Sequence, residues 1–454
     1  MTTNVNEKKE FWKLLFSLAL PIAFQHLLVN SLTFIDTLFM SQLGDVALSA
    51  SGMATQWNWL LSMISFGICS GAAIFIAQYW GSSQHEGIRK TYSVAFVSAF
   101  VISIIFSLVA ISFPTQIISV FNRDKMVINA GTEYLSVVAF AYPATVLTSL
   151  QGTVLRSTEK VKLPMFVSGI SVSANIFLDY ALVFGKFGLP LMGIKGAALA
   201  TAISAWLGYI VLIAVSFGQQ NVLIVPLKQF FSIKLSDFKN FMRRAFPVIL
   251  NEFMWGLGTV CANAIFSNTG YENYAACTIL RTVESLCMIL FIGINDGGAV
   301  IVGKTIGEGN YDIAYQRAKR LTVLTPLLSA IIAVFAISFK DQVIYLFNMS
   351  GNITETTVSI ARILIIVYSL ELIIRNIPYT LVCSVFRAGG DSVTGAKFDL
   401  ICLWLIAIPV TFFFAFFTKV SFPLLFFISY ISEDLPKSTL CLLHFKSKKW
   451  IKPV

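Results

Sequence analysis

Residues 52–80 read GMATQWNWLLSMISFGICSGAAIFIAQYW and contain no Asp, Glu, Lys, Arg or His. A helix needs about 20 mainly apolar residues to cross the hydrocarbon core of a bilayer, and this run is longer than that. Because lipid offers no hydrogen-bond partner to an open backbone, the run is predicted to form a membrane-spanning helix.

Similar runs recur along the whole chain. Of its 454 residues, 56% are hydrophobic and only 12% are charged, which is about half the charged fraction of a soluble domain. This composition excludes a soluble enzyme, a disordered protein and a secreted disulfide scaffold, and the runs are too long for barrel strands. We therefore predict an all-α polytopic membrane protein with twelve transmembrane helices, at about residues 11–39, 52–80, 91–113, 132–155, 163–185, 191–217, 242–267, 277–303, 321–339, 358–386, 397–417 and 421–443.

The basic residues predict the orientation. With the N-terminus inside, the inner segments carry 24 Lys and Arg and the outer segments carry 7. Since cytoplasmic loops hold the basic excess, we predict that both termini are cytoplasmic. The net charge of +10 then reflects membrane orientation and not a nucleic-acid partner. The polar first ten residues lead into a full span, so we expect no cleavable signal peptide.

The chain also contains an internal repeat. One constant offset aligns a proline and several glycines of the two halves, namely Pro21 with Pro247, Gly44 with Gly270, Gly67 with Gly293 and Gly71 with Gly297. Each half has six predicted spans, so the halves form two six-helix bundles of the same orientation, a pattern typical of secondary transporters. We predict an N-terminal lobe at 1–220, a cytoplasmic linker at 221–240 and a C-terminal lobe at 241–454. The repeated small residues allow close helix packing.

Several kinds of chemistry are absent from the sequence. The seven cysteines form no CxxC pair and lie mostly in apolar runs, so we interpret them as buried hydrophobes. The three histidines are scattered, and no GxxxxGK[ST] motif is present. We therefore expect no catalytic residues, no metal site and no cofactor, and we expect the protein not to be an enzyme.

Ionisable side chains inside spans are costly and usually functional, so they are the candidate site residues. Asp36 lies fifteen residues after Pro21, or about 22 Å along a helix, in the outer half of the first span. Asp179 lies at a similar depth in the fifth span, with Asn175 one turn earlier on the same face. A buried carboxylate readily takes up a proton, so these residues form a predicted cation or proton site. Thr201 in the sixth span is a further candidate.

The second half holds the remaining candidates among the ionisable residues of the spans. Glu252 lies at mid-depth in the seventh span, and Asp296 lies among glycines in the eighth. Two pairs have helical spacing and could also form local structural ion pairs, namely Arg281 with Glu284 and Glu371 with Arg375. We treat Glu252, Arg281, Glu284, Glu371 and Arg375 as candidates for a substrate or ion site.

Several of these segments together carry a family resemblance. They are Pro21 to Gly44 with Ile35-Asp36-Thr37, the glycine-bearing second and eighth runs, Leu155-Arg156-Ser157-Thr158-Glu159-Lys160 with its repeat Phe386-Arg387-Ala388-Gly389-Gly390-Asp391, and Asn175-Ile-Phe-Leu-Asp179. In this ordered set the chain resembles the multidrug and toxic compound extrusion (MATE) family, and looks most like its DinF- and MepA-like bacterial members. Asn376 stands where some NorM-like members carry an acidic residue.

The resemblance implies a function and a location. It implies a secondary active antiporter of a bacterial inner or plasma membrane that exports small organic cations in exchange for H+ or Na+, by alternating access of two lobes. In that family Asp36, Asn175 and Asp179 match the N-lobe cation site. We expect a monomer in the lipid bilayer. The alternative is a lipid-linked oligosaccharide or peptidoglycan-precursor flippase of a related fold, which would need a broad basic cavity. The candidate residues that we name in the spans are six acids and two arginines, which favours cationic cargo instead.

Overall fold

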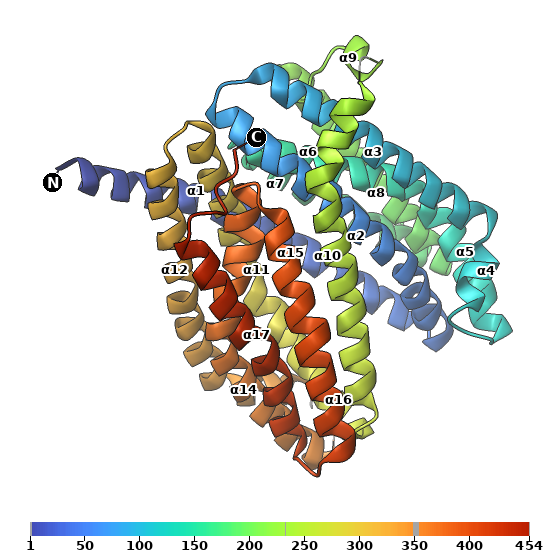
Figure 1. Ribbon diagram of the computed structural model, residues 1–454. Coiled ribbons are helices and arrows are strands. Elements are labelled where there is room, and N and C mark those ends of the chain that lie inside the picture. Colours follow the sequence, from blue (N-terminus) through green and yellow to red (C-terminus); the bar gives the residue numbers. More distant parts are fainter. Residues whose placement is uncertain (1, 232, 348–353, 454) are drawn as a thin grey trace. The chain divides into compact units, whose positions relative to one another are not determined.

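The computed structural model describes residues 2–231, 233–347 and 354–453, and all regular structure in these residues is helical. The helices, in chain order, are α1 (Thr2–Gln42), α2 (Asp45–Gly81), α3 (His85–Ser112), α4 (Pro114–Ser119), α5 (Lys125–Val138), the 3-10 helix η1 (Ala139–Ala141), α6 (Tyr142–Ser157), α7 (Lys162–Val183), α8 (Gly193–Gln219), α9 (Leu227–Phe231), α10 (Leu235–Ser267), α11 (Tyr271–Gly307), α12 (Tyr311–Ser338), α13 (Lys340–Phe347), α14 (Glu355–Tyr379), the π-helical η2 (Thr380–Phe386), α15 (Ser392–Leu400), the π-helical η3 (Ile401–Ala407), α16 (Ile408–Phe417) and α17 (Phe422–Lys446). Figure 1 shows their course.

Each predicted span lies on one of these helices or on a continuous series of them. Within the described residues, eleven helical segments are long and apolar enough to cross a membrane. The twelfth predicted span corresponds to α17, which falls short because Glu433, Asp434 and Lys437 lie in its middle. The chain is therefore a multi-pass helical membrane protein, in which α17 carries three charged side chains in the middle of the twelfth predicted span.

The helices belong to two compact units, each with its own core. The N-terminal unit comprises Leu20–Ile249, and its core includes Leu61, Tyr92 and Leu150. The C-terminal unit comprises Met1–Ala19 and Leu250–Val454, and its core is rich in aromatic side chains. There α14 packs against both α12 and α17 (Figure 1). The predicted lobe boundaries at 220 and 241 stay a prediction.

The repeat has a direct structural counterpart. Gly44 and Gly270 precede α2 and α11 with φ angles of 96° and 130°, a backbone region in which side chains other than glycine are strained. In the N-terminal unit, α2 packs so tightly on α10 that a Cβ at Gly71 would lie 2.5 Å from the Cβ of Ala245. In the C-terminal unit, Gly297 of α11 faces Ala19 of α1, where a Cβ at Gly297 would lie 3.3 Å from the Ala19 nitrogen. The offset of the repeat relates Gly71 to Gly297 and also Ala19 to Ala245, so the two contacts are equivalent.

These contacts show that the units exchange segments. The beginning of α1 belongs to the C-terminal unit, where Glu7 forms ion pairs with Arg317 (3.2 Å) and Arg320 (2.6 Å) of α12. The beginning of α10 belongs to the N-terminal unit, which ends at Ile249. Each half of the sequence therefore contributes its first helical segment to the unit that the other half builds.

The residues that follow α17 pack against the turn that follows η2. Trp450 is fully buried between Phe386 and Phe445, and a Cβ at Gly389 would lie 2.5 Å from the Trp450 ring. Lys452 donates its backbone N–H to the Gly389 carbonyl (2.7 Å), and its ammonium lies 2.7 Å from Asp391. These contacts make the turn and the C-terminal segment a single packed element.

Candidate functional site

The N-terminal unit brings the predicted residues Asp36, Asn175, Asp179 and Thr201 together. Asp36 comes from α1, Asn175 and Asp179 come from successive turns of α7, and Thr201 comes from α8. The close pairing of α7 with α8 places the three helices around one polar cluster. Because an i, i+4 pair shares a helix face, Asn175 and Asp179 point to the same place.

The Asn175 amide is the centre of this cluster. Its hydrogen-bond network assigns the amide nitrogen to the carboxylate side. In this orientation the nitrogen donates to Asp179 Oδ2 (3.0 Å) and to Asp36 Oδ1 (3.1 Å). The amide oxygen accepts from the Ser204 hydroxyl (3.3 Å) and from the backbone N–H of Thr201 (3.2 Å). One neutral side chain thus holds two carboxyl groups in a fixed arrangement.

Within the described residues, the carboxyl groups of this cluster lack a basic partner. Asp179 and Asn175 are each 1% exposed, and Asp36 is half-buried. The two carboxyl groups lie within hydrogen-bonding reach of each other, and Tyr134 of α5 faces both of them. Within the described residues neither carboxylate has a lysine or arginine partner, and Asp179 Oδ1 accepts no hydrogen bond. Since a buried charge needs compensation, this arrangement is suited to bind a proton or a small cation.

The candidates of the second half form ion pairs with distant residues. Glu252 lies 2.6 Å from the guanidinium of Arg387, which is 5% exposed. Arg375 of α14 lies 2.9 Å from Glu284 of α11 and faces the rings of Tyr368 and Tyr430. These pairs link different helices of the C-terminal unit.

The helical spacing of two pairs suggested local ion pairs, and the structure shows other partners. Arg375 pairs with Glu284 across helices and not with Glu371. Arg281 donates to the Asn263 side chain of α10 instead of pairing with Glu284. Glu371 is 2% exposed, and neither of its carboxylate oxygens accepts a hydrogen bond from a described residue. Helix–helix neighbours therefore decide the pairing here, since the sequence spacing alone favours the local partners.

Sequence reasoning missed a second group of buried charges in this unit. Lys437 of α17 lies 2.5 Å from Asp399 of α15 and 3.5 Å from Glu433, and Asp399 also accepts from the Asn251 amide (2.9 Å). Lys437 lies inside the predicted span 421–443, yet it is one of the 24 basic residues that the orientation count assigns to the inner segments. The signal was present in the sequence, because Glu433 and Lys437 have the i, i+4 spacing of a helical ion pair within the last apolar run.

Two further polar residues of the spans, Asn376 and Asp296, lie in the C-terminal unit. Asn376 is fully buried and donates to the Ser329 hydroxyl (2.7 Å) and to the Leu372 carbonyl (3.2 Å), so its amide nitrogen is satisfied by neutral groups. Asp296 lies half-buried on α11 and faces Tyr379 of α14. In the described part of the chain, no group of three or more His, Cys, Asp or Glu is placed to hold a metal ion.

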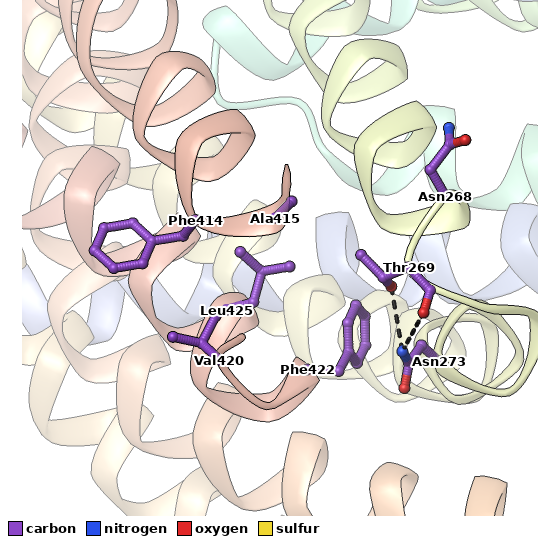
Figure 2. A pocket seen from close by; sticks show the side chains of 8 residues that line it. All are labelled: Asn268, Thr269, Asn273, Phe414, Ala415, Val420, Phe422 and Leu425. Atoms are coloured by element: carbon purple, nitrogen blue, oxygen red, sulfur yellow. Dashed lines mark hydrogen bonds between the residues drawn. The ribbon is translucent and has the colours of Figure 1, made fainter. Parts of the chain in front are cut away.

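A pocket of the C-terminal unit lies apart from these charges, where the turn before α11 meets the connection from α16 to α17 (Figure 2). Asn273 donates there to the carbonyl (2.9 Å) and the hydroxyl (3.3 Å) of Thr269. The pocket is lined by Asn268, Thr269, Asn273, Phe414, Ala415, Val420, Phe422 and Leu425. None of these side chains is charged, and none is a candidate from the sequence.

Comparison with known proteins identifies relatives over most of the chain. The model of the MatE family matches residues 21–181 and 247–413, two segments whose starts have the offset of the internal repeat. A probable multidrug resistance protein NorM of Thermotoga maritima is 28% identical over 98% of this chain and 94% of its own length. An uncharacterized transporter, YisQ of Bacillus subtilis, is 24% identical over 96% of this chain and 94% of its own length.

Solved structures show the same fold. The Vibrio cholerae MATE transporter VcmN in its bent form superimposes with a TM-score of 0.87 at 18% identity, covering 98% of both chains. An outward-facing multidrug resistance MATE family transporter superimposes with a TM-score of 0.84 at 16% identity, covering 96% of both chains.

Proposed function

The chain belongs to the MatE family, and from this premise we propose that it is a secondary active antiporter, which exports small organic cations in exchange for H+ or Na+. The full-length relative from Thermotoga maritima carries the name of a multidrug resistance protein. Exchange driven by an ion gradient needs a site in the membrane that binds the coupling ion reversibly. The cluster of Asp36, Asn175 and Asp179 has the composition of such a site.

The observation that carries this proposal is the pair of carboxyl groups held by one amide. Asn175 donates to both Asp36 and Asp179, while no basic side chain of the described residues neutralises them. A bound proton or cation would therefore change the balance of charge where α1 meets α7. Because a ligand shifts a conformational equilibrium only by its differential affinity for the two states, ion binding here would bias alternating access of the two lobes.

The energy source is the electrochemical gradient of the coupling ion. It supplies about 2.3 kcal/mol per elementary charge for each 100 mV, in addition to the concentration term. The protein then needs no cofactor and carries out no covalent chemistry. We further propose that it acts as a monomer in the cell membrane with both termini cytoplasmic, and that nucleic acids are not among its partners.

A lipid-linked oligosaccharide or peptidoglycan-precursor flippase is less well supported. A pyrophosphate group requires an excess of basic side chains. In the C-terminal unit Arg387, Arg375 and Lys437 already lie beside carboxylates, in the pairs Glu252–Arg387, Glu284–Arg375 and Asp399–Lys437. The charge balance of the spans thus favours cationic cargo.

The test is ethidium efflux from intact cells or everted vesicles that contain the protein, with H+ and Na+ gradients imposed separately. We expect efflux to follow one gradient in the unchanged protein and to be lost in Asp36→Asn. The matched control is Asp45→Asn, which changes an exposed aspartate at the start of α2 and should leave efflux unchanged. Efflux under neither gradient, with folded protein in the membrane, would contradict the proposal, as would full activity of Asp36→Asn.

A further inference from the structure

Glu371 and Asp434 form a second buried carboxyl pair, and it lies in the C-terminal unit. Glu371 on α14 is 2% exposed and Asp434 on α17 is 4% exposed. The two side chains lie within hydrogen-bonding reach of each other where α14 packs on α17. Neither oxygen of Glu371 accepts a hydrogen bond from any described donor. Two ionised carboxylates in contact would have no hydrogen to share and would repel each other.

The surrounding bases are already paired with other carboxylates. The charged groups that act on Glu371 are Asp434 from α17, Arg375 from its own helix and Glu284 from α11. Arg375 lies 2.9 Å from Glu284. On the other side of the pair, Asp434 faces Lys437, whose ammonium lies 2.5 Å from Asp399 and 3.5 Å from Glu433.

The charge count of this network is unequal. Six carboxylates face three basic side chains, namely Glu252, Glu284, Glu371, Asp399, Glu433 and Asp434 against Arg375, Arg387 and Lys437. Each base has its own short carboxylate contact, so Glu371 and Asp434 are left facing each other. An unpaired buried charge is expensive, and a buried acid pair lowers this cost by retaining a proton.

We propose that Glu371 and Asp434 hold one proton between them and form a second proton-binding site, separate from the cluster around Asp36. The proton is covalently bound to an oxygen of one carboxyl group, and this O–H donates a hydrogen bond to an oxygen of the other carboxylate. The hydrogen bond gives that acceptor a partner and links α14 to α17. A metal ion is a poorer occupant, because no set of three acidic, His or Cys ligands converges among the described residues. A role of this proton in a transport cycle rests on the proposed function. The presence of the proton between Glu371 and Asp434 does not depend on that function.

Infrared spectroscopy tests the proposal without any transport. The protein is reconstituted in nanodiscs at pH 7 as an Asp36→Asn/Asp179→Asn double variant, which removes the carboxyl pair of the N-terminal unit. The carbonyl stretch of a protonated carboxylic acid is separate from the amide bands and shifts in D2O. We expect the double variant to show this band, and we expect Glu371→Gln or Asp434→Asn, added singly, to remove the intensity of one acid.

A matched control and two independent variants keep the result interpretable. Glu308→Gln changes an exposed glutamate at the end of α11 and should leave the band intact. Size-exclusion chromatography checks that each variant is folded. If Glu371→Gln does not fold, Asp434→Asn tests the same carboxyl pair. Absence of the band from the double variant, or its full intensity in either folded variant, would overturn the proposal. Loss of ethidium efflux alone would bear on the antiport function and not on this proton.

Discussion

Replacement of Gly71 by alanine should destabilise the N-terminal unit through overpacking. The new methyl group would lie 2.5 Å from the Cβ and 2.9 Å from the Cα of Ala245, whereas carbon atoms in contact prefer about 3.5–4.0 Å. The facing atoms are the Cβ and the backbone of Ala245, which no side-chain rotation can move, so α2 and α10 must move apart by about 1 Å to restore that separation. Insertion of an extra methyl group into a packed interface typically costs about 1–3 kcal/mol.

Two other glycine-to-alanine changes isolate this cost. Gly52 lies on the same helix with no atom within 4 Å of its potential Cβ, so Gly52→Ala should show only the gain in helix propensity, about 1 kcal/mol. Gly297 is the repeat counterpart of Gly71, but its nearest contacts are 3.3 Å, at Ala19 and Leu18. Gly297→Ala should therefore cost less than Gly71→Ala.

Thermal unfolding of the purified protein in detergent measures all three variants. A change of 1 kcal/mol shifts Tm by roughly 2–4 °C in a domain of 150–250 residues. We therefore expect Gly71→Ala to melt roughly 2–12 °C below Gly52→Ala, with Gly297→Ala between them. Equal melting of Gly71→Ala and Gly52→Ala would refute the reasoning, because it would show that α2 and α10 do not approach as closely as described.

Three further predictions concern the C-terminal unit. Trp450→Ala removes a fully buried indole and should cost about 3–5 kcal/mol, measured as a lower Tm in detergent; an unchanged Tm would contradict the packing described for this segment. Glu252→Ala removes the carboxylate partner, 2.6 Å away, of a buried guanidinium and should cost about 3–5 kcal/mol, whereas the double variant with Arg387→Met should recover part of that loss. Burial opposes ionisation of Asp391, yet hydrogen bonds from Lys452 and neighbouring groups hold its pKa below the ordinary value. Its contribution to stability should be complete above the ordinary aspartate pKa and be lost as the pH falls through the lowered value, so Asp391→Asn should flatten the acid limb of a Tm–pH profile.

The positions of the spans could be predicted because they depend on local sequence. An apolar run that is long enough to cross a bilayer has only one low-cost structure in lipid, so each predicted span lies on a helix of the structure. The cluster of Asp36, Asn175 and Asp179 could be predicted from the sequence for a similar reason. Its members could be assigned a depth by counting residues along helices, and side chains of similar depth in one bundle can meet.

The pairing of charges in the C-terminal unit could not be predicted in the same way. Asn251 and Asp399 are 148 residues apart, and the ion pair between Glu284 and Arg375 depends on which helices are neighbours. Periodicity gives the face of a helix but not the identity of the helix opposite it. Lys437 lies inside the predicted span 421–443, but the orientation count assigned it to an inner segment, because the sequence alone does not show which residues near the inner end of a span are buried.

The exchanged helical segments have an evolutionary consequence. Gly71 is covered by Ala245 from the second half of the sequence, and Gly297 is covered by Ala19 from the first half. An ancestral polypeptide with a single copy of the repeat would have left this glycine surface open, unless a second copy of the same chain supplied the missing helix. Such an ancestor would have been a homodimer with swapped segments. Duplication and fusion of its gene would then have preserved the swap, so that neither half of the present chain can complete its own fold.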